Sequence, residues 1–311
     1  MELIPDWGRQ PSGSRPRTVF TIGVFDGLHR GHRALIDLVM KRAVRLKARS
    51  LVLTFEPHPL TVLADSAAPP LLTTVEQKAE ILADWGLDGL GVMSFTRELA
   101  ATEPMKFLSR HLARFIDPAA VVLGPDFAFG RDAQGGPDTI RLWLSSLSPH
   151  ARLIQVQPIA GDSGLLSSSQ IRQHLKEGLV ERAAQDLGRC YRLSGSVVHG
   201  LARGRTLGFP TANLGQIRQI VPGPGVYATW VRLAGQTWPG MTSIGYNPTF
   251  GDKSLTVETH ILDFDRFIYG QTLDLDFVAR LRQMVRFESV ELLTRQLAQD
   301  RETTRNLFFS N

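Results

Sequence analysis

The chain has 311 residues, enough for two domains at about 150 residues each. Hydrophobic residues make up 43% of it and charged residues 21%, a balance that excludes a disordered chain and is typical of compact folding. The formal charge of +5 indicates affinity for anions, but the basic residues are dispersed, which favours a solvated surface over a nucleic-acid-binding patch.

Cysteine content and hydropathy limit the compartment. The single cysteine, Cys190, excludes an intramolecular disulfide and a multi-cysteine zinc site and suits a reducing compartment. No run of about 18 or more apolar residues is present, and residues 1–17 lack the apolar core of a signal peptide. We therefore expect a cytoplasmic protein with a loose N-terminal leader and no membrane or nucleic-acid partner. A homo-oligomer is compatible with the sequence.

In the first half, short apolar runs alternate with helical periodicity. The predicted strands are 18–25, 50–55, 89–95, 119–125 and 152–159, and the predicted helices are 31–48, 74–85 and 103–116. Thr73 with Glu76, or Thr74 with Gln77, fits a capping box, and Pro104 fits a first helical turn. This alternation predicts a doubly wound α/β domain with a parallel sheet.

The second half changes character after two short helices predicted at 167–178 and 178–188. The predicted strands, rich in β-branched and aromatic residues, are 191–200, 225–235, 255–264 and 272–281. Ser289 is suited to cap a closing helix over 289–308. These patterns predict a small antiparallel β-barrel with a closing α-helix, and we place the two domains at 1–187 and 188–311.

The segment GVFDGLHRGH, Gly23–His32, stands where the first strand turns into the first helix. A helix N-terminus presents unpaired N–H groups and a partial positive charge, so it binds phosphates, with a gain of roughly 0.3–1 kcal/mol per negative group. His29 and His32, three positions apart, are expected to face the same way and to donate to phosphate oxygens. Taken alone, such a pair is more often a surface or packing feature.

Three more motifs follow in the first half: TFEPHP at 54–59, GPDFAFG at 124–130 and LSSSQIR at 166–172. The last two follow predicted strands, at the edge where open α/β sheets bind ligands. Ser168 and Ser169 could donate hydroxyl groups to a triphosphate, with Arg172 as a cation. Serines before a helix are also common N-caps, so each motif alone is ordinary.

Together these four motifs, in this order, resemble the adenylyltransferase half of bacterial bifunctional riboflavin kinase/FAD synthetases, over roughly residues 18–187. The resemblance implies a nucleotidyltransferase-type fold that transfers AMP from ATP to FMN and releases pyrophosphate. The residues implied in ATP binding are Gly23, Phe25, His29, His32, Asp126, Ser168, Ser169 and Arg172. His29 and His32 would be catalytic, and Phe55 and His58 would contact the flavin.

A class I aminoacyl-tRNA synthetase also carries a tetrapeptide similar to H-x-G-H. We disfavour that alternative because the sequence has no Lys-Met-Ser-Lys-Ser-like loop and no large tRNA-reading domain.

The second half contains GRTLGFPTAN at 204–213 and lacks the G-x-x-x-x-G-K-[ST] motif, which excludes a kinase of the P-loop kind. Small residues can let backbone N–H groups bind an anion, and the Thr211 hydroxyl and Asn213 carbonyl are hard oxygen ligands for Mg²⁺. The glycines alone indicate only a Gly-rich β-turn.

GFPTAN followed by NPTF at 247–250 and VETH at 257–260 resembles the riboflavin kinase domain. The resemblance implies that Asn247 binds flavin and that Glu258 receives the proton of the ribityl 5′-hydroxyl, since phosphoryl transfer needs one acceptor near the nucleophile. The residues implied in binding ATP and Mg²⁺ are Gly204, Gly208, Pro210, Thr211 and Asn213.

The sequence departs from the family at three places without losing a proposed catalytic residue. Cys190 stands where proline is common, Ser169 where threonine is common, and Gln283-Met284 where Pro-Glu is common. The sequence thus predicts a bifunctional enzyme of FAD biosynthesis with ATP, riboflavin and FMN as substrates and Mg²⁺ as cofactor. The alternatives are a chain with one active half, and a non-catalytic flavin- or nucleotide-binding regulator that acts on nucleic acid.

Overall fold

The computed structural model describes residues 1–8, 15–63, 68–157, 160–161, 164–200, 203–246 and 255–309. Contacts divide the chain into two compact units. The first unit comprises Met1–Pro69 and Thr73–Ser167, and the second comprises Pro70–Leu72 and Ser168–Asn311. Among the described residues, no helix combines the length and apolar character needed to cross a membrane.

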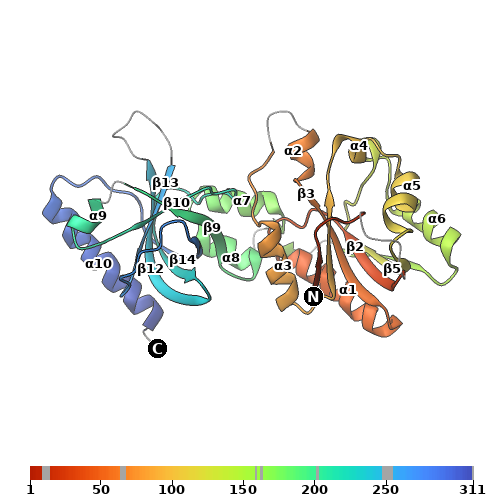
Figure 1. Ribbon diagram of the computed structural model, residues 1–311, viewed down its shortest axis with the longest axis horizontal. Helices are drawn as coiled ribbons and strands as arrows, with labels where there is room; N and C mark the ends of the chain where they lie inside the picture. Colours follow the sequence, from red (N-terminus) through yellow and green to blue (C-terminus); the bar gives the residue numbers. More distant parts are fainter. Residues whose placement is uncertain are drawn as a thin grey trace. The chain divides into compact units, whose positions relative to one another are not determined.

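The first unit contains a parallel sheet of six strands (Figure 1). The strands are β1 (Glu2–Ile4), β2 (Arg17–Ile22), β3 (Arg49–Glu56), β4 (Gly89–Ser94), β5 (Asp117–Leu123) and β6 (Arg152–Gln155). Their order is β1-β4-β3-β2-β5-β6, and each neighbouring pair is parallel. The predicted doubly wound α/β fold is confirmed. The direction of winding reverses between β2 and β5, so their carboxyl ends form the switch point where such sheets bind ligands.

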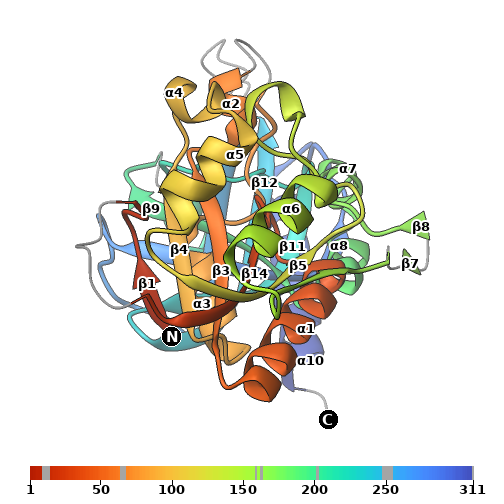
Figure 2. The same cartoon turned by 90° about the vertical axis from the view of Figure 1, so that its right-hand side faces the viewer.

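Helices cover both faces of this sheet because successive strand residues point to opposite sides. The helices are α1 (Arg30–Leu46), α2 (Pro59–Leu63), α3 (Val75–Asp84), α4 (Arg97–Ala100), α5 (Pro104–Phe107) and α6 (Pro137–Leu147). On one face Val19 and Val52 pack with Ile36 of α1 and Leu82 of α3. On the other face Phe20 packs against Trp143 of α6. Figure 2 shows α5 and α6 in front of the strands.

Local helix signals were partly confirmed. Thr74 and Gln77 form the capping box of α3, whereas Thr73 does not pair with Glu76 in this way. Pro104 occupies the first turn of α5, as predicted. The continuous helix predicted over 103–116 is wrong, because a π-helical segment, Leu108–Leu112, follows α5. The sequence also did not predict the helices α2, α4 and α6, a 3-10 turn, Arg131–Ala133, or the pair of short strands β7 (Ala160–Gly161) and β8 (Gly164–Leu165).

The loose leader expected at the N-terminus is wrong for its first residues. Glu2–Ile4 forms the edge strand β1 beside β4. Ile4 and Trp7 are buried in the apolar cluster under the sheet, and the Trp7 indole Nε1–H donates to the His111 carbonyl at 2.7 Å. Two buried apolar side chains hold the segment, and residues 9–14 lie outside the described residues.

The second unit contains a closed antiparallel barrel, which confirms the second fold prediction (Figure 1). The strands are β9 (Tyr191–Val198), β10 (Ala212–Gly215), β11 (Gly225–Leu233), β12 (Gln236–Tyr246), β13 (Leu255–Ile261) and β14 (Thr272–Arg282). Their order is β10-β13-β12-β11-β14-β9, and pairing of β9 with β10 closes the barrel. The sequence did not predict β10 or β12. β10 has four residues, and Pro239 and Gly240 interrupt the strand-like pattern of β12.

Within the described residues of this unit, the helices are α7 (Ser168–Lys176), α8 (Val180–Leu187), α9 (Arg203–Thr206) and α10 (Val290–Phe309). Ile171 of α7 and Val180 of α8 belong to the same apolar cluster as Phe277 of the barrel. The closing helix α10 begins where predicted, since the Ser289 hydroxyl accepts the Leu292 N–H at 3.3 Å.

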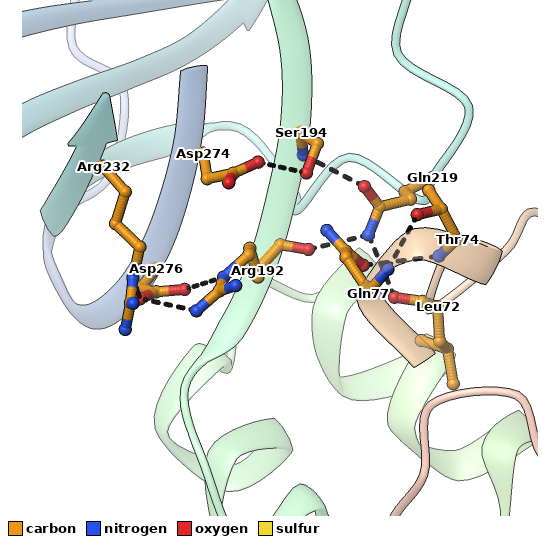
Figure 3. A network of polar contacts seen from close by, with 9 residues as sticks. All are labelled: Leu72, Thr74, Gln77, Arg192, Ser194, Gln219, Arg232, Asp274 and Asp276. Atoms are coloured by element: carbon orange, nitrogen blue, oxygen red, sulfur yellow. Dashed lines mark hydrogen bonds and ion pairs between the residues drawn. The ribbon is translucent and has the colours of Figure 1, made fainter. Parts of the chain in front are cut away.

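The segment Pro70–Leu72 is part of the second unit although it comes from early in the chain. Leu71 forms a parallel bridge with Gln219, and the Leu71 carbonyl accepts the Ile220 N–H at 2.9 Å. Figure 3 shows the Gln219 amide between two carbonyls, to which it donates: that of Leu72 at 3.1 Å and that of Arg192 at 2.7 Å. The buried Gln219 side chain therefore holds this segment against the barrel by hydrogen bonds.

Candidate active sites

The turn that follows β2 is conformationally strained. Phe25, Gly27 and Leu28 have φ values of 48°, 84° and 44°. The left-handed region costs a residue other than glycine about 1–3 kcal/mol, and such residues persist where their surroundings fix them. The turn is therefore held by its neighbours. Gly27 donates its N–H to the Thr73 hydroxyl at 2.9 Å, and the buried Lys78 ammonium donates to the Val24 carbonyl at 3.0 Å.

His29 and His32 lie together at the start of α1. Their rings stack with centroids 3.7 Å apart and planes 20° apart, which confirms that they face the same way. His29 is the N-cap residue, and its Nδ1 accepts the His32 N–H at 3.3 Å. Because Nδ1 accepts, the proton of a neutral His29 ring is assigned to Nε2. The Nε2–H is then the N–H donor of this ring, which lies at the helix N-terminus, where phosphates are readily bound.

A cavity of about 960 Å³ opens beside this turn, and it lies at the switch point. Its walls include Gly23 after β2 and Asp126 after β5. Several phenylalanines also line it: Phe55, Phe95, Phe107, Phe127 and Phe129. Ligand cavities typically measure about 300–1,000 Å³ and combine apolar walls with a few polar groups. The aromatic walls suit a flat ring system.

Two other sequence-predicted residues of the first unit, Phe25 and His58, are not part of the lining of this cavity. Phe25 is buried and meets His32 edge to face, with ring centroids 5.2 Å apart. His58 does not line the cavity. Its Nδ1 accepts the Leu60 N–H at 3.2 Å beside α2.

Ser168, Ser169 and Arg172 belong to the second unit. The serines begin α7, and the Arg172 guanidinium, only 8% exposed, donates through Nε to the Pro70 carbonyl at 2.8 Å.

In the second unit, the predicted kinase residues come together where β10 pairs with β13. The Thr211 hydroxyl donates to the Glu258 carboxylate at 3.4 Å, and Asn213 is the cross-strand partner of Glu258. A cavity of about 330 Å³ is lined by Thr211 and Asn213, together with Arg205 and Pro210. Thr211 and Asn213 thus line a small cavity, and the Glu258 carboxylate, which is not part of its lining, accepts the Thr211 hydroxyl.

The glycines of this loop have specific structural roles. A Cβ at Gly204 would lie 2.3 Å from the Phe209 carbonyl oxygen, which leaves no room for a larger residue. Gly208 has a φ of +79°, a conformation that glycine adopts without strain. The loop can therefore fold tightly before β10.

His260 ends the VETH motif, and the sequence implies no role for it. Its Nδ1 lies 2.8 Å from the Pro210 carbonyl oxygen, and because a carbonyl only accepts, Nδ1 is the donor. Burial lowers the pKa of His260, which favours the neutral ring. β13 therefore holds the loop through His260 and contacts Thr211 through Glu258. Because His260 and Pro210 are 50 positions apart, no local sequence pattern predicts their contact.

The donor set of the second unit fits Mg²⁺. Among the described residues, no group of three or more His, Cys, Asp or Glu side chains could hold a metal by itself. Mg²⁺ is commonly bound through one or two protein oxygens, with substrate phosphates and water completing the shell. The Thr211 hydroxyl, the Asn213 amide oxygen and the Glu258 carboxylate are hard oxygen donors of this kind.

Asn247 and Met284 are two further positions that the sequence singles out. Asn247, predicted to bind flavin, lies outside the described residues. Met284, which stands where the family commonly has glutamate, is 45% exposed, and its Sδ accepts the Ser243 hydroxyl at 3.7 Å.

Comparisons with known proteins agree with this arrangement. A family model described as FAD synthetase matches residues 12–170, and one described as riboflavin kinase matches residues 187–308. A bifunctional riboflavin kinase/FMN adenylyltransferase from Listeria monocytogenes is 37% identical over 294 residues, covering 93% of this chain and 92% of its own. The enzyme of that name from Escherichia coli is 35% identical over 309 residues, covering 99% and 98%.

A solved structure shares the fold over the whole chain. The crystal structure named as a macrolide-efflux protein from Streptococcus pneumoniae matches with a TM-score of 0.86 at 31% identity, covering 98% of this chain and 99% of that one. That name describes the Streptococcus pneumoniae protein and says nothing about the activity of this chain. By the two family models and by relatives that match over almost their full length, the chain belongs to the family of bifunctional riboflavin kinase/FMN adenylyltransferases.

Proposed function

We propose that riboflavin phosphorylation takes place where β10 meets β13, and that FMN adenylylation takes place at the turn after β2. The chain is both a riboflavin kinase and an FMN adenylyltransferase, with ATP, riboflavin and FMN as substrates. The observation that carries the assignment is the pairing of Asn213 with Glu258 across β10 and β13, with Thr211 bonded to the same carboxylate.

In the kinase reaction, Glu258 accepts the proton of the riboflavin 5′-hydroxyl while that oxygen attacks the γ-phosphorus of ATP and ADP leaves. Thr211 and Asn213 would hold Mg²⁺, which would supply positive charge against the ATP phosphates. Gly204, Gly208 and Pro210 shape the loop so that its backbone can approach the ATP phosphates. We also keep Asn247 as a proposed flavin contact.

In the adenylyltransferase reaction, a phosphate oxygen of FMN attacks the α-phosphorus of ATP and pyrophosphate leaves. His29, through Nε2–H, and His32 donate to the developing negative charge beside the N-terminus of α1. The flavin ring occupies the aromatic cavity near Phe55, with Asp126 at its wall.

The remaining assignments for adenylylation come from the family motifs. They place ATP contacts at Gly23, Phe25, Ser168, Ser169 and Arg172 and a flavin contact at His58, and we retain each as a proposal. We further propose a cytoplasmic location, since one cysteine suits a reducing compartment. Dispersed basic residues support a role without nucleic-acid or membrane partners, and a homo-oligomer remains compatible with the sequence.

Two variants test which site catalyses which reaction. His29→Ala should lower FAD formation from FMN by about 10²-fold or more and spare riboflavin phosphorylation. Glu258→Ala should lower riboflavin phosphorylation by roughly 10²–10⁴-fold and spare FAD formation from added FMN. Chromatography of riboflavin, FMN and FAD over time measures both reactions. Equal loss of both activities in either variant would contradict the assignment.

A further inference from the structure

A buried lysine lies beneath the turn that carries the catalytic histidines. Lys78 of α3 is 3% exposed, and its ammonium donates to the Val24 carbonyl at 3.0 Å. The Thr54 hydroxyl donates to the same carbonyl at 3.0 Å. Neither side chain has a role in the reaction proposed above, yet both hold the residue that begins the strained turn.

Asp26 holds the other side of this turn. Its carboxylate, on a side chain only 3% exposed, accepts the Thr73 N–H at 3.0 Å and the Thr73 hydroxyl at 3.2 Å. That hydroxyl in turn accepts the Gly27 N–H at 2.9 Å. Lys78 and Asp26 therefore hold successive parts of the same turn, directly before His29.

The charges explain why a lysine stands there. Burial lowers the pKa of the Lys78 ammonium, and the carboxylates of Asp26 and Glu56 act in the opposite direction. A buried carboxylate beside a phosphate-binding turn repels the phosphates unless a cation neutralises it. Burying that cation also costs stability, so packing alone does not account for it.

We propose that Lys78 is a positioning residue for adenylyl transfer: its ammonium holds the Val24 carbonyl and places a positive charge beneath the turn proposed to bind ATP. The inference rests on the proposed role of His29 and His32. It assigns the lysine an electrostatic part in ATP binding without contact with the substrate.

The test compares Lys78→Met with Lys41→Met, a matched change at an exposed lysine of α1. Lys78→Met should raise KM for ATP and lower kcat/KM for FAD formation by roughly 10–10²-fold. Riboflavin phosphorylation should stay within about twofold of wild type. Tm should fall, because the Val24 carbonyl and the nearby Asp26 carboxylate lose a buried positive group. Unchanged FAD formation or an equal loss of riboflavin phosphorylation would overturn the proposal.

A double-mutant cycle isolates the charge. Adding Asp26→Asn to Lys78→Met removes a negative charge from the same turn, so kcat/KM for FAD formation should recover by about threefold or more. A further loss in the double variant would overturn the electrostatic account. If His29→Ala abolishes FAD formation while Lys78→Met does not affect it, the proposed function stands and only this inference fails. If His29→Ala leaves FAD formation intact, the proposed function itself fails.

Discussion

The ring nitrogen that carries the proton differs between the histidines of the two sites. His29 accepts a backbone N–H through Nδ1, so a neutral ring carries its proton on Nε2. His260 donates through Nδ1 to the Pro210 carbonyl and so acts within the protein. In each case the hydrogen bond made by one nitrogen decides what the other can do.

Replacement of His260 should affect only the kinase. His260→Leu removes the donor to Pro210, and an unpaired carbonyl at the loop should lower kcat/KM for riboflavin phosphorylation by roughly tenfold. His260→Asn places an amide N–H near the position of Nδ1 and should recover most of the activity. Steady-state kinetics with riboflavin, and FAD formation from added FMN as the internal control, provide the measurement. Equal kinetics for the Leu and Asn variants would exclude the hydrogen bond as the cause.

At the scale of elements, strand register builds the kinase site. Pairing of β10 with β13 sets Asn213 opposite Glu258 and Ala212 opposite Thr259. A slip of one residue would turn these side chains to opposite faces of the barrel. The loop that precedes β10 must therefore fold tightly, because its conformation sets the register in which β10 pairs with β13.

Gly204→Ala tests that loop. The added Cβ would lie 2.3 Å from the Phe209 carbonyl oxygen, so the backbone must shift and Thr211 must move with it. We expect riboflavin phosphorylation to fall by about tenfold or more, since small displacements at a reacting site are costly. Gly136→Ala is the control, because a Cβ there meets nothing within 4 Å. Kinetics indistinguishable from wild type would mean that the loop tolerates the shift.

Gln219→Ala tests whether the Gln219 side chain holds the segment Pro70–Leu72 against the barrel. The change removes one buried and two partly buried hydrogen bonds, to the Leu72 carbonyl, the Arg192 carbonyl and the Ser194 N–H. Each unsatisfied group costs about 1–3 kcal/mol, so the free energy of unfolding should fall by at least that amount. Chemical denaturation measures it, with the exposed Gln236→Ala as control. An unchanged midpoint would show that Gln219 does not hold the segment.

At the scale of the whole molecule, one chain carries two reactions whose substrates form a series. The product of the kinase is the substrate of the adenylyltransferase, so a single incubation with riboflavin and ATP reports on both. FMN should appear before FAD in such a time course.

Removal of the metal should stop this series at its first step. Thr211, Asn213 and Glu258 together supply one negative charge and no cation, so they cannot neutralise the phosphates of ATP by themselves. With excess EDTA, riboflavin should persist, and Mg²⁺ added in excess should restore FMN and then FAD. Chromatography follows all three flavins. FMN formation at the full rate in the presence of EDTA would contradict the proposed Mg²⁺ site.

By itself, the sequence determined both fold types, the family, the start of α10 and the shared face of His29 and His32. Each depends on local patterns: strand and helix periodicity, capping residues, and motifs read in order along the chain. Such patterns report on residues within a few positions of one another.

Only the tertiary structure decided the edge strand β1, the partner of His260 and the contact of Lys78 with Val24. Lys78 and Val24 are 54 positions apart, and His260 and Pro210 are 50 positions apart. Whether a buried lysine or histidine meets a particular carbonyl depends on how whole elements pack. Periodicity specifies the face of an element that is buried, and packing specifies which atoms meet there.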